Sequence, residues 1–172
     1  MDHIPDNGAD FTTPVDCEKW DVAYCPPPEP PPGTPYGAEV VCVVGDRVLL
    51  VSEDGQQWRL PSGCAAPHEE CRHTVRRKVR EEACATVMES RLLGFGRSVC
   101  VRGPRQGLVL IRSMWRAEVR LAPWNPCCGT AHRRLLSIGE AFRSLAVPDG
   151  LGPFYRRLFA QAVVSRAAVH HL

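Results

Sequence analysis

Short apolar runs rich in β-branched residues begin the folded part of the chain. Residues 39–44 form the first run, and residues 48–51 follow directly after a Gly-Asp pair. Two such runs separated by a turn sequence are typical of paired strands. Further strand-like segments lie at 97–101 and 107–119. The hydrophobic pattern therefore predicts two groups of strands.

A helical repeat separates these two groups. Residues 69–85 contain no proline or glycine, and their apolar positions recur every four residues, at Cys71, Val75, Val79 and Ala83. This spacing predicts a helix with one apolar stripe. Two further helices are expected at 138–145 and 154–166. Strands on both sides of a central helix, followed by helices, predict a single α/β domain with a mixed sheet.

Proline sets the expected start of this domain. Seven of the 16 prolines lie in the ten residues from Pro26 to Pro35. Proline can neither donate to a strand ladder nor continue a helix, so this segment predicts an extended, stiff spacer. We therefore expect a polar, proline-rich extension and linker over 1–35, the domain over 36–168 and a tail over 169–172.

Composition and charge narrow the class of protein. The chain has 172 residues, of which 44% are hydrophobic and 23% charged, as in ordinary folded domains. The net charge of +2 favours neither a nucleic-acid partner nor a membrane surface. No apolar stretch is long enough for a membrane span, and the first residues do not form a signal peptide. We expect a cytoplasmic protein, and the sequence indicates no oligomeric state.

Nine cysteines are many for this length, and the number is odd. Zinc sites usually show repeated pairs of cysteines two to four residues apart, and that spacing is missing here. A site built from Cys127, Cys128 and His132 is the alternative, but it lacks the expected spacing. Without paired spacing or a signal peptide, reduced thiols are the better interpretation.

Three charged residues lie together on the central helix. Lys78, Glu81 and Glu82 are spaced i, i+3 and i+4, which places them on one side, next to the apolar stripe. Two neighbouring carboxylates at the border of a core suit a hard cation such as Mg²⁺, and the preceding turn offers the Ser62 carbonyl. The alternative is a solvated helix face held in ordinary ion pairs.

The spacing around these residues is specific. Gly63 is followed after five residues by Glu69 and after seven more by Arg77, with Glu81 and Glu82 in register behind it. This pattern resembles the Nudix box. The segments 58–61 and 134–141 are also similar to the strand before the box and to the strand-into-helix segment near the end of Nudix domains. The resemblance covers about residues 36–168 and implies a Nudix-type α/β/α sandwich.

The resemblance also implies a function. It predicts a hydrolase of a nucleoside diphosphate linked to another group, in which water attacks a phosphorus with Mg²⁺, or Mn²⁺, as cofactor. Glu81, Glu82 and the Ser62 carbonyl would hold the cation. Arg77 would act with the two glutamates in catalysis by bracing them, and Glu69 and Gly63 would support the site.

The box of this chain is degenerate at several positions. Lys78 stands where the family has a glutamate, and Cys84 and His68 stand where it has glycines. An ammonium at Lys78 would take the space and charge of a cation, although it could still bind a diphosphate oxygen. We expect Lys78, Trp58 and Arg59 to contact substrate, while core packing is the alternative for Trp58.

Two functions therefore remain open. The first is a Mg²⁺-dependent diphosphate hydrolase weakened by Lys78, with a base from outside the box such as Glu118. The second is a catalytically inactive Nudix domain that binds a nucleotide or a protein partner.

The cysteine pattern leads to a direct test. Thiol titration of the denatured, unreduced protein should find close to nine free thiols, because no disulfide is expected among the nine cysteines. Stoichiometric zinc in the purified protein would contradict the interpretation that these residues are simple thiols.

Overall fold

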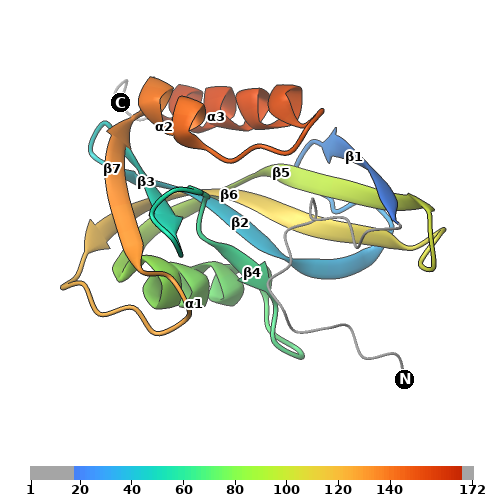
Figure 1. Ribbon diagram of the computed structural model, residues 1–172, viewed down its shortest axis with the longest axis horizontal. Coiled ribbons are helices and arrows are strands. Elements are labelled where there is room, and N and C mark those ends of the chain that lie inside the picture. The colour runs from blue at the N-terminus through green and yellow to red at the C-terminus, as the bar shows by residue number, and fades with distance from the viewer. Residues whose placement is uncertain (1–17, 168–172) are drawn as a thin grey trace.

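The computed structural model describes residues 18–167, and the side chains of 18–164. The first 17 residues of the predicted extension 1–35 and the whole of the predicted tail 169–172 lie outside these residues. These residues form seven strands and three helices. They are arranged as one α/β/α sandwich (Figure 1). Their bounds are β1 Lys19–Cys25, β2 Thr34–Val44, β3 Arg47–Ser52, β4 Ser62–Cys64, α1 Cys71–Ala83, β5 Ala85–Arg102, β6 Val109–Leu121, β7 His132–Ser137, α2 Ile138–Ser144 and α3 Gly152–Ala167.

All seven strands belong to one mixed sheet. Its order is β1-β5-β6-β2-β3-β7, and the short β4 pairs with β2 beside this path. The pairing of β2 with β6 is parallel, and the other pairings are antiparallel. The predicted fold class, an α/β/α sandwich with a mixed sheet, is confirmed.

Strand β2 is the centre of the molecule because both of its faces are buried. Val40 and Cys42 pack toward α1, whereas Val41 and Val43 pack toward α3. Successive side chains of a strand point to opposite faces. A strand whose two faces are both covered therefore has apolar residues at consecutive positions. This explains the continuous valine-rich sequence there.

Helix α1 covers one face of the sheet with the predicted stripe. Val75, Val79 and Ala83 are fully buried against β2, β3 and β6, but Cys71 at the first turn is exposed. Helices α2 and α3 cover the opposite face, where Leu158 is fully buried (Figure 1). No helix in the described part of the chain is long and apolar enough to cross a membrane.

The sheet extends further toward the N-terminus than the sequence indicated. Strand β1 lies within the predicted extension and pairs with β5 at one edge of the sheet. The proline segment therefore connects β1 to β2 inside the domain, from Cys25 opposite Phe95 of β5 to Thr34 opposite Leu110 of β6. Strands lie about 4.8 Å apart, so three spacings need roughly 14 Å, which an extended proline-rich segment rising about 3.1 Å per residue easily spans.

Strand β5 is also longer than expected, beginning directly after α1 and not at residue 97. Its first half is mostly exposed or half-buried and is followed by Gly94, so the sequence shows no clear strand pattern there. Pairing with β6 along nearly its whole length forms the strand nevertheless.

The packing of α3 generates a stability prediction. Leu158→Ala should lower the free energy of unfolding by about 2–5 kcal/mol, because it removes a fully buried side chain from the core. Val164→Ala on the same helix is the matched control: its side chain is 68% exposed, so the change should stay within about 0.5 kcal/mol. Urea unfolding measures both, and equal effects would contradict the assignment of the buried face.

Candidate active site

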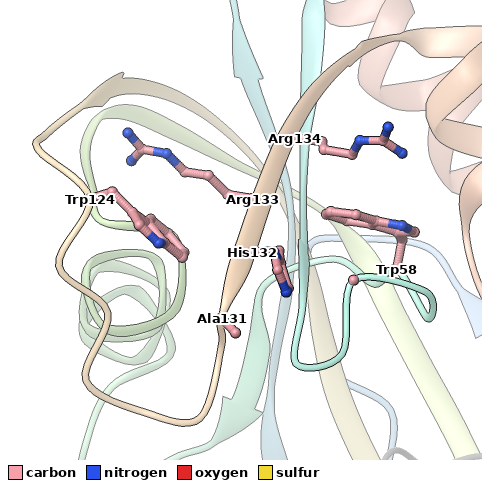
Figure 2. Close-up of a pocket in the computed structure, with 7 residues that line it drawn as sticks. Trp58, Trp124, Ala131, His132, Arg133 and Arg134 are labelled. Carbon is pink, nitrogen blue, oxygen red and sulfur yellow. The ribbon is translucent and has the colours of Figure 1, made fainter.

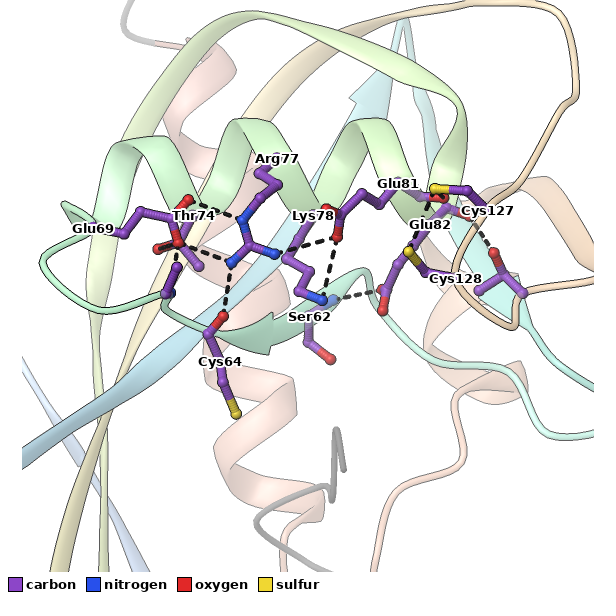
Figure 3. Close-up of polar contacts among 12 residues, drawn as sticks. Ser62, Cys64, Glu69, Thr74, Arg77, Lys78, Glu81, Glu82, Cys127 and Cys128 are labelled. Carbon is purple, nitrogen blue, oxygen red and sulfur yellow. Dashed lines mark hydrogen bonds and ion pairs between the residues drawn. The ribbon is translucent and has the colours of Figure 1, made fainter. Parts of the chain in front are cut away.

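The loop between β4 and α1 is held to the helix by Arg77. Its guanidinium donates to both carboxylate oxygens of Glu69, at 2.9 and 2.8 Å, and to the Cys64 carbonyl at 2.9 Å (Figure 3). Glu69 also accepts from Thr74 Oγ1 and from the Ala66 amide, both at 2.9 Å. These hydrogen bonds, with Arg77 the main cause, hold the pKa of Glu69 at about 2. Arg77 thus joins the loop to the helix, and its role in catalysis stays a prediction.

Glu81 lies between two cationic side chains. Its Oε2 is 3.2 Å from Arg77 Nη1 and 3.3 Å from Lys78 Nζ. The alkyl chain of Lys78 lies directly on Gly63, where a Cβ would overlap with Lys78 Cε. Glycine at this position therefore makes room for Lys78 to reach Glu81.

Glu82 is buried, and its carboxylate accepts hydrogen bonds from β4 and from the segment before β4. Arg59 donates to both of its carboxylate oxygens, at 2.8 and 3.3 Å. The Ser62 amide also donates to Glu82, at 3.0 Å (Figure 3). Ser62 thus meets Glu82 through its N–H, and the role of its carbonyl as a metal ligand stays a prediction. Arg59 was expected to contact substrate, but here its guanidinium is occupied by Glu82.

Each box carboxylate therefore has a cationic partner: Arg77 for Glu69, Lys78 and Arg77 for Glu81, and Arg59 for Glu82. Among residues 18–167 no group of three or more His, Cys, Asp or Glu side chains is arranged to hold a metal. In this arrangement the residues do not fit a divalent cation, because the ammonium of Lys78 sits on the carboxylate that would bind it. Glu81 and Glu82 offer the carboxylate oxygens that Mg²⁺ prefers as ligands, but cationic side chains already neutralise their negative charge.

The end of α1 is covered by the loop after β6. Thr130 Oγ1 donates to the Glu82 carbonyl at 2.9 Å, and Cys127 Sγ lies 3.8 Å from the Glu81 carbonyl. Cys127 and Cys128 have their sulfur atoms 3.3 Å apart (Figure 3). The hydrogen bond from Cys127, partial burial and the nearby charge of Glu81 raise the pKa of Cys128 to about 11. Their adjacency in sequence gave no sign that they flank the box.

Two of the departures from the box keep the backbone of a glycine. His68 and Cys84 are the two described non-glycine residues with positive φ, at 62° and 49°. Cys84 is the left-handed residue that ends α1. A side chain in this conformation costs roughly 1–2 kcal/mol, which is why glycine is favoured there. Both positions therefore have a backbone conformation that glycine adopts at lower cost.

Two other expected residues lie elsewhere. Trp58 is 7% exposed and packs in the core on the α3 side, and the guanidinium of Arg134 covers its ring at 5.0 Å. Glu118 bonds to Arg116, whose guanidinium also contacts α3, while the neighbouring Ala117 and Val119 face α1. Glu118 therefore lies on the face opposite α1, so the expectation that it supplies a base to the box is wrong.

Comparison with known proteins identifies the fold. No protein-family model matches the sequence, and no curated protein matches it. Solved structures do match. A mutant of the Bacillus subtilis pyrophosphohydrolase BsRppH is 18% identical, with 84% of this chain and 90% of that chain covered and a TM-score of 0.67.

Two further structures agree with this result. A Nudix hydrolase from Nitrosomonas europaea is 19% identical over 78% of this chain and 90% of that chain, with a TM-score of 0.60. An ADP-ribose pyrophosphatase from Streptococcus suis is 17% identical over 76% of this chain and 90% of that chain, with a TM-score of 0.51. The chain has the Nudix fold, in agreement with the resemblance of its sequence to the Nudix box.

The ion pair of Glu69 generates a pH prediction. Its folded pKa of about 2 lies below the ordinary value of 4.5, so the pair stabilises the protein above pH 4.5 and this contribution is lost as the pH falls toward 2. Glu69→Gln should therefore cost on the order of 3 kcal/mol at pH 7 and progressively less below pH 4.5. Urea unfolding of both proteins across this range checks it. A difference that does not change with pH would show that the charge of Glu69 is not involved.

Proposed function

We propose that the chain is a Nudix-type hydrolase of a nucleoside diphosphate linked to another group, with a cation site that Lys78 weakens. The observation that carries the proposal is the box itself: Arg77 and Arg59 hold Glu69 and Glu82 in fixed positions, and Glu81 lies beside them on α1. Carboxylates that are each held by several hydrogen bonds are more typical of a reaction site than of a helix face exposed to solvent.

The proposed cofactor is Mg²⁺, which Mn²⁺ can replace, with Glu81, Glu82 and the Ser62 carbonyl as its ligands. Such a cation neutralises charge on a diphosphate. Lys78 must first leave Glu81, because a protonated ammonium cannot ligate a metal and occupies the space and charge that the cation would take. At about 4 Å and an effective dielectric constant near 20, each Lys–Glu attraction reaches up to ~4 kcal/mol before desolvation, so the competition is strong.

A second function is favoured by the charge of the box. Each of its three carboxylates already has a cationic partner, so a phosphorylated ligand can meet Lys78 with no metal present. In this case the domain would bind a nucleotide-type ligand or a protein partner without turnover. We place either function in the cytoplasm.

The two functions are separated by reversing one charge. Lys78→Glu should raise Mg²⁺ affinity and increase hydrolysis by about tenfold or more, because about 1.4 kcal/mol of transition-state stabilisation is enough for a tenfold change. The measurements are Mg²⁺ titration and release of phosphate or mononucleotide from dinucleotides and nucleoside diphosphates.

Arg80→Glu is the matched control, since it makes the same change of charge on an exposed position of α1. It should leave Mg²⁺ affinity near that of the wild type. Equal affinity in wild type and Lys78→Glu would show that the interpretation of position 78 is wrong. Metal-free nucleotide binding with no hydrolysis by either protein would favour the binding module. Efficient wild-type turnover that Lys78→Glu abolishes would make Lys78 a phosphate-binding residue of a rebuilt site.

A further inference from the structure

Two cysteine side chains lie together at the surface beside the box. Cys127 and Cys128 are both exposed, and their sulfur atoms are 3.3 Å apart. Figure 3 shows them at the end of α1, where Cys127 Sγ lies 3.8 Å from the Glu81 carbonyl. The proposed function makes no use of either thiol.

The loop that carries the pair, residues 122–131, is held at both ends. At its start, the Ala122 amide donates to the Cys84 carbonyl at 2.8 Å. At its end, Thr130 Oγ1 donates to the Glu82 carbonyl at 2.9 Å. The two thiols are therefore kept in place beside α1, although they are exposed.

Arg133 of β7 joins both ends of this loop to the end of α1. It donates to the carbonyls of Ala83 and Cys84 at 2.9 and 3.0 Å, and to the Ala122 carbonyl at 2.9 Å. Its guanidinium also covers the ring of Trp124 at 5.1 Å, and Figure 2 shows both side chains on the same side of β7. The base of the loop is thus preformed.

The distance between the two sulfur atoms is short enough for a disulfide to form. A disulfide bond is about 2.05 Å long, so the sulfur atoms must approach by about 1.3 Å. The Cα atoms of adjacent residues lie about 3.8 Å apart, below the roughly 4.4–6.8 Å of ordinary disulfides. A disulfide between adjacent cysteines is therefore strained, and strained, exposed disulfides are readily reduced again.

We propose that Cys127 and Cys128 form a site of reversible oxidation, at which hydrogen peroxide converts the two thiols into a disulfide. This site goes beyond the proposed function and does not depend on it. Cys71 is exposed as well, but among the described residues it has no sulfur atom within hydrogen-bonding distance. A single exposed thiol has no neighbouring thiol with which to form a disulfide, so peroxide takes it to higher oxidation states.

The reaction takes two steps. In the first, the Cys127 thiolate attacks a peroxide oxygen. An S–O bond forms, the O–O bond breaks, and the departing oxygen takes up the proton that the thiol lost and leaves as water. In the second, the sulfur of Cys128 attacks the sulfenic sulfur of Cys127. An S–S bond forms, the S–O bond breaks, and the hydroxide leaves as water with the proton of Cys128. The two thiols together lose two electrons, and the peroxide is reduced to two molecules of water.

The order of these steps follows from the surroundings of Cys128. The hydrogen bond with Cys127, partial burial and the nearby charge of Glu81 raise the pKa of Cys128 to about 11, so it is protonated at neutral pH. Because the thiolate is the nucleophile, the first step belongs to Cys127. Cys128 loses its proton only in the second step, in which its partner is already next to it.

The test is oxidation of the reduced, native full chain with an equimolar amount of hydrogen peroxide, followed by catalase and then iodoacetamide under denaturing conditions. Trypsin releases residues 121–133 as one peptide, whose two cysteines are Cys127 and Cys128. After oxidation this peptide should carry no label and be about 2 Da lighter than its reduced form, and dithiothreitol before alkylation should restore two labels. The number of free thiols in the denatured protein should fall by two, from nine to seven.

Two variants test whether the pair is responsible. In Cys127→Ser the same peptide should no longer lose two hydrogens, because Cys128 has no partner. Cys71→Ser is the matched control: it removes another exposed thiol, and the peptide should be oxidised as in the wild type. The proposal is overturned if the wild-type peptide keeps both thiols, if it gains oxygen instead of losing two hydrogens, or if dithiothreitol does not restore its thiols.

Discussion

One guanidinium determines the shape of the candidate site. Arg77 reaches from the middle of α1 to Glu69 in the preceding loop, to the Cys64 carbonyl at the end of β4 and to Glu81 one turn further along the helix. Without it, the loop would have few contacts with the helix, since residues 65–68 are exposed. Arginine suits this task because its planar fork of donors remains charged at any physiological pH.

The net charge of the same region depends on the residue at position 78. A carboxylate at position 78 would leave the box strongly negative, and such a site needs a cation from solution. The ammonium of Lys78 supplies that positive charge from within the chain, 3.3 Å from Glu81. The backbone of the box is held by other residues, namely Gly63, Arg77 and the left-handed residues at 68 and 84. Fold and chemistry are thus specified by different residues of one motif.

Sequence predicted the parts of the structure that depend on local pattern. The central helix was expected over 69–85 and spans Cys71–Ala83, because its apolar repeat and its charges agree. Strand β1 was missed, since its seven residues become a strand only by pairing with β5, far away in the chain. The contacts of Arg59 with Glu82 and of Arg133 with the end of α1 were missed for the same reason. Each of these contacts joins two segments that lie close together only once the complete sheet has formed.

The parallel pairing of β2 with β6 has a consequence for how the chain reaches this fold. β2 is the central strand, yet the neighbour that covers its second edge is made only after α1 and β5. Pairing β2 with β6 closes the long loop between them. The chain loses entropy in closing this loop before the contacts between the strands form, and folding is slower as a result. During synthesis, the valine-rich β2 therefore stays without its main partner until most of the domain has left the ribosome. The N-terminal half is thus the segment that depends most on protection from aggregation while the chain is incomplete.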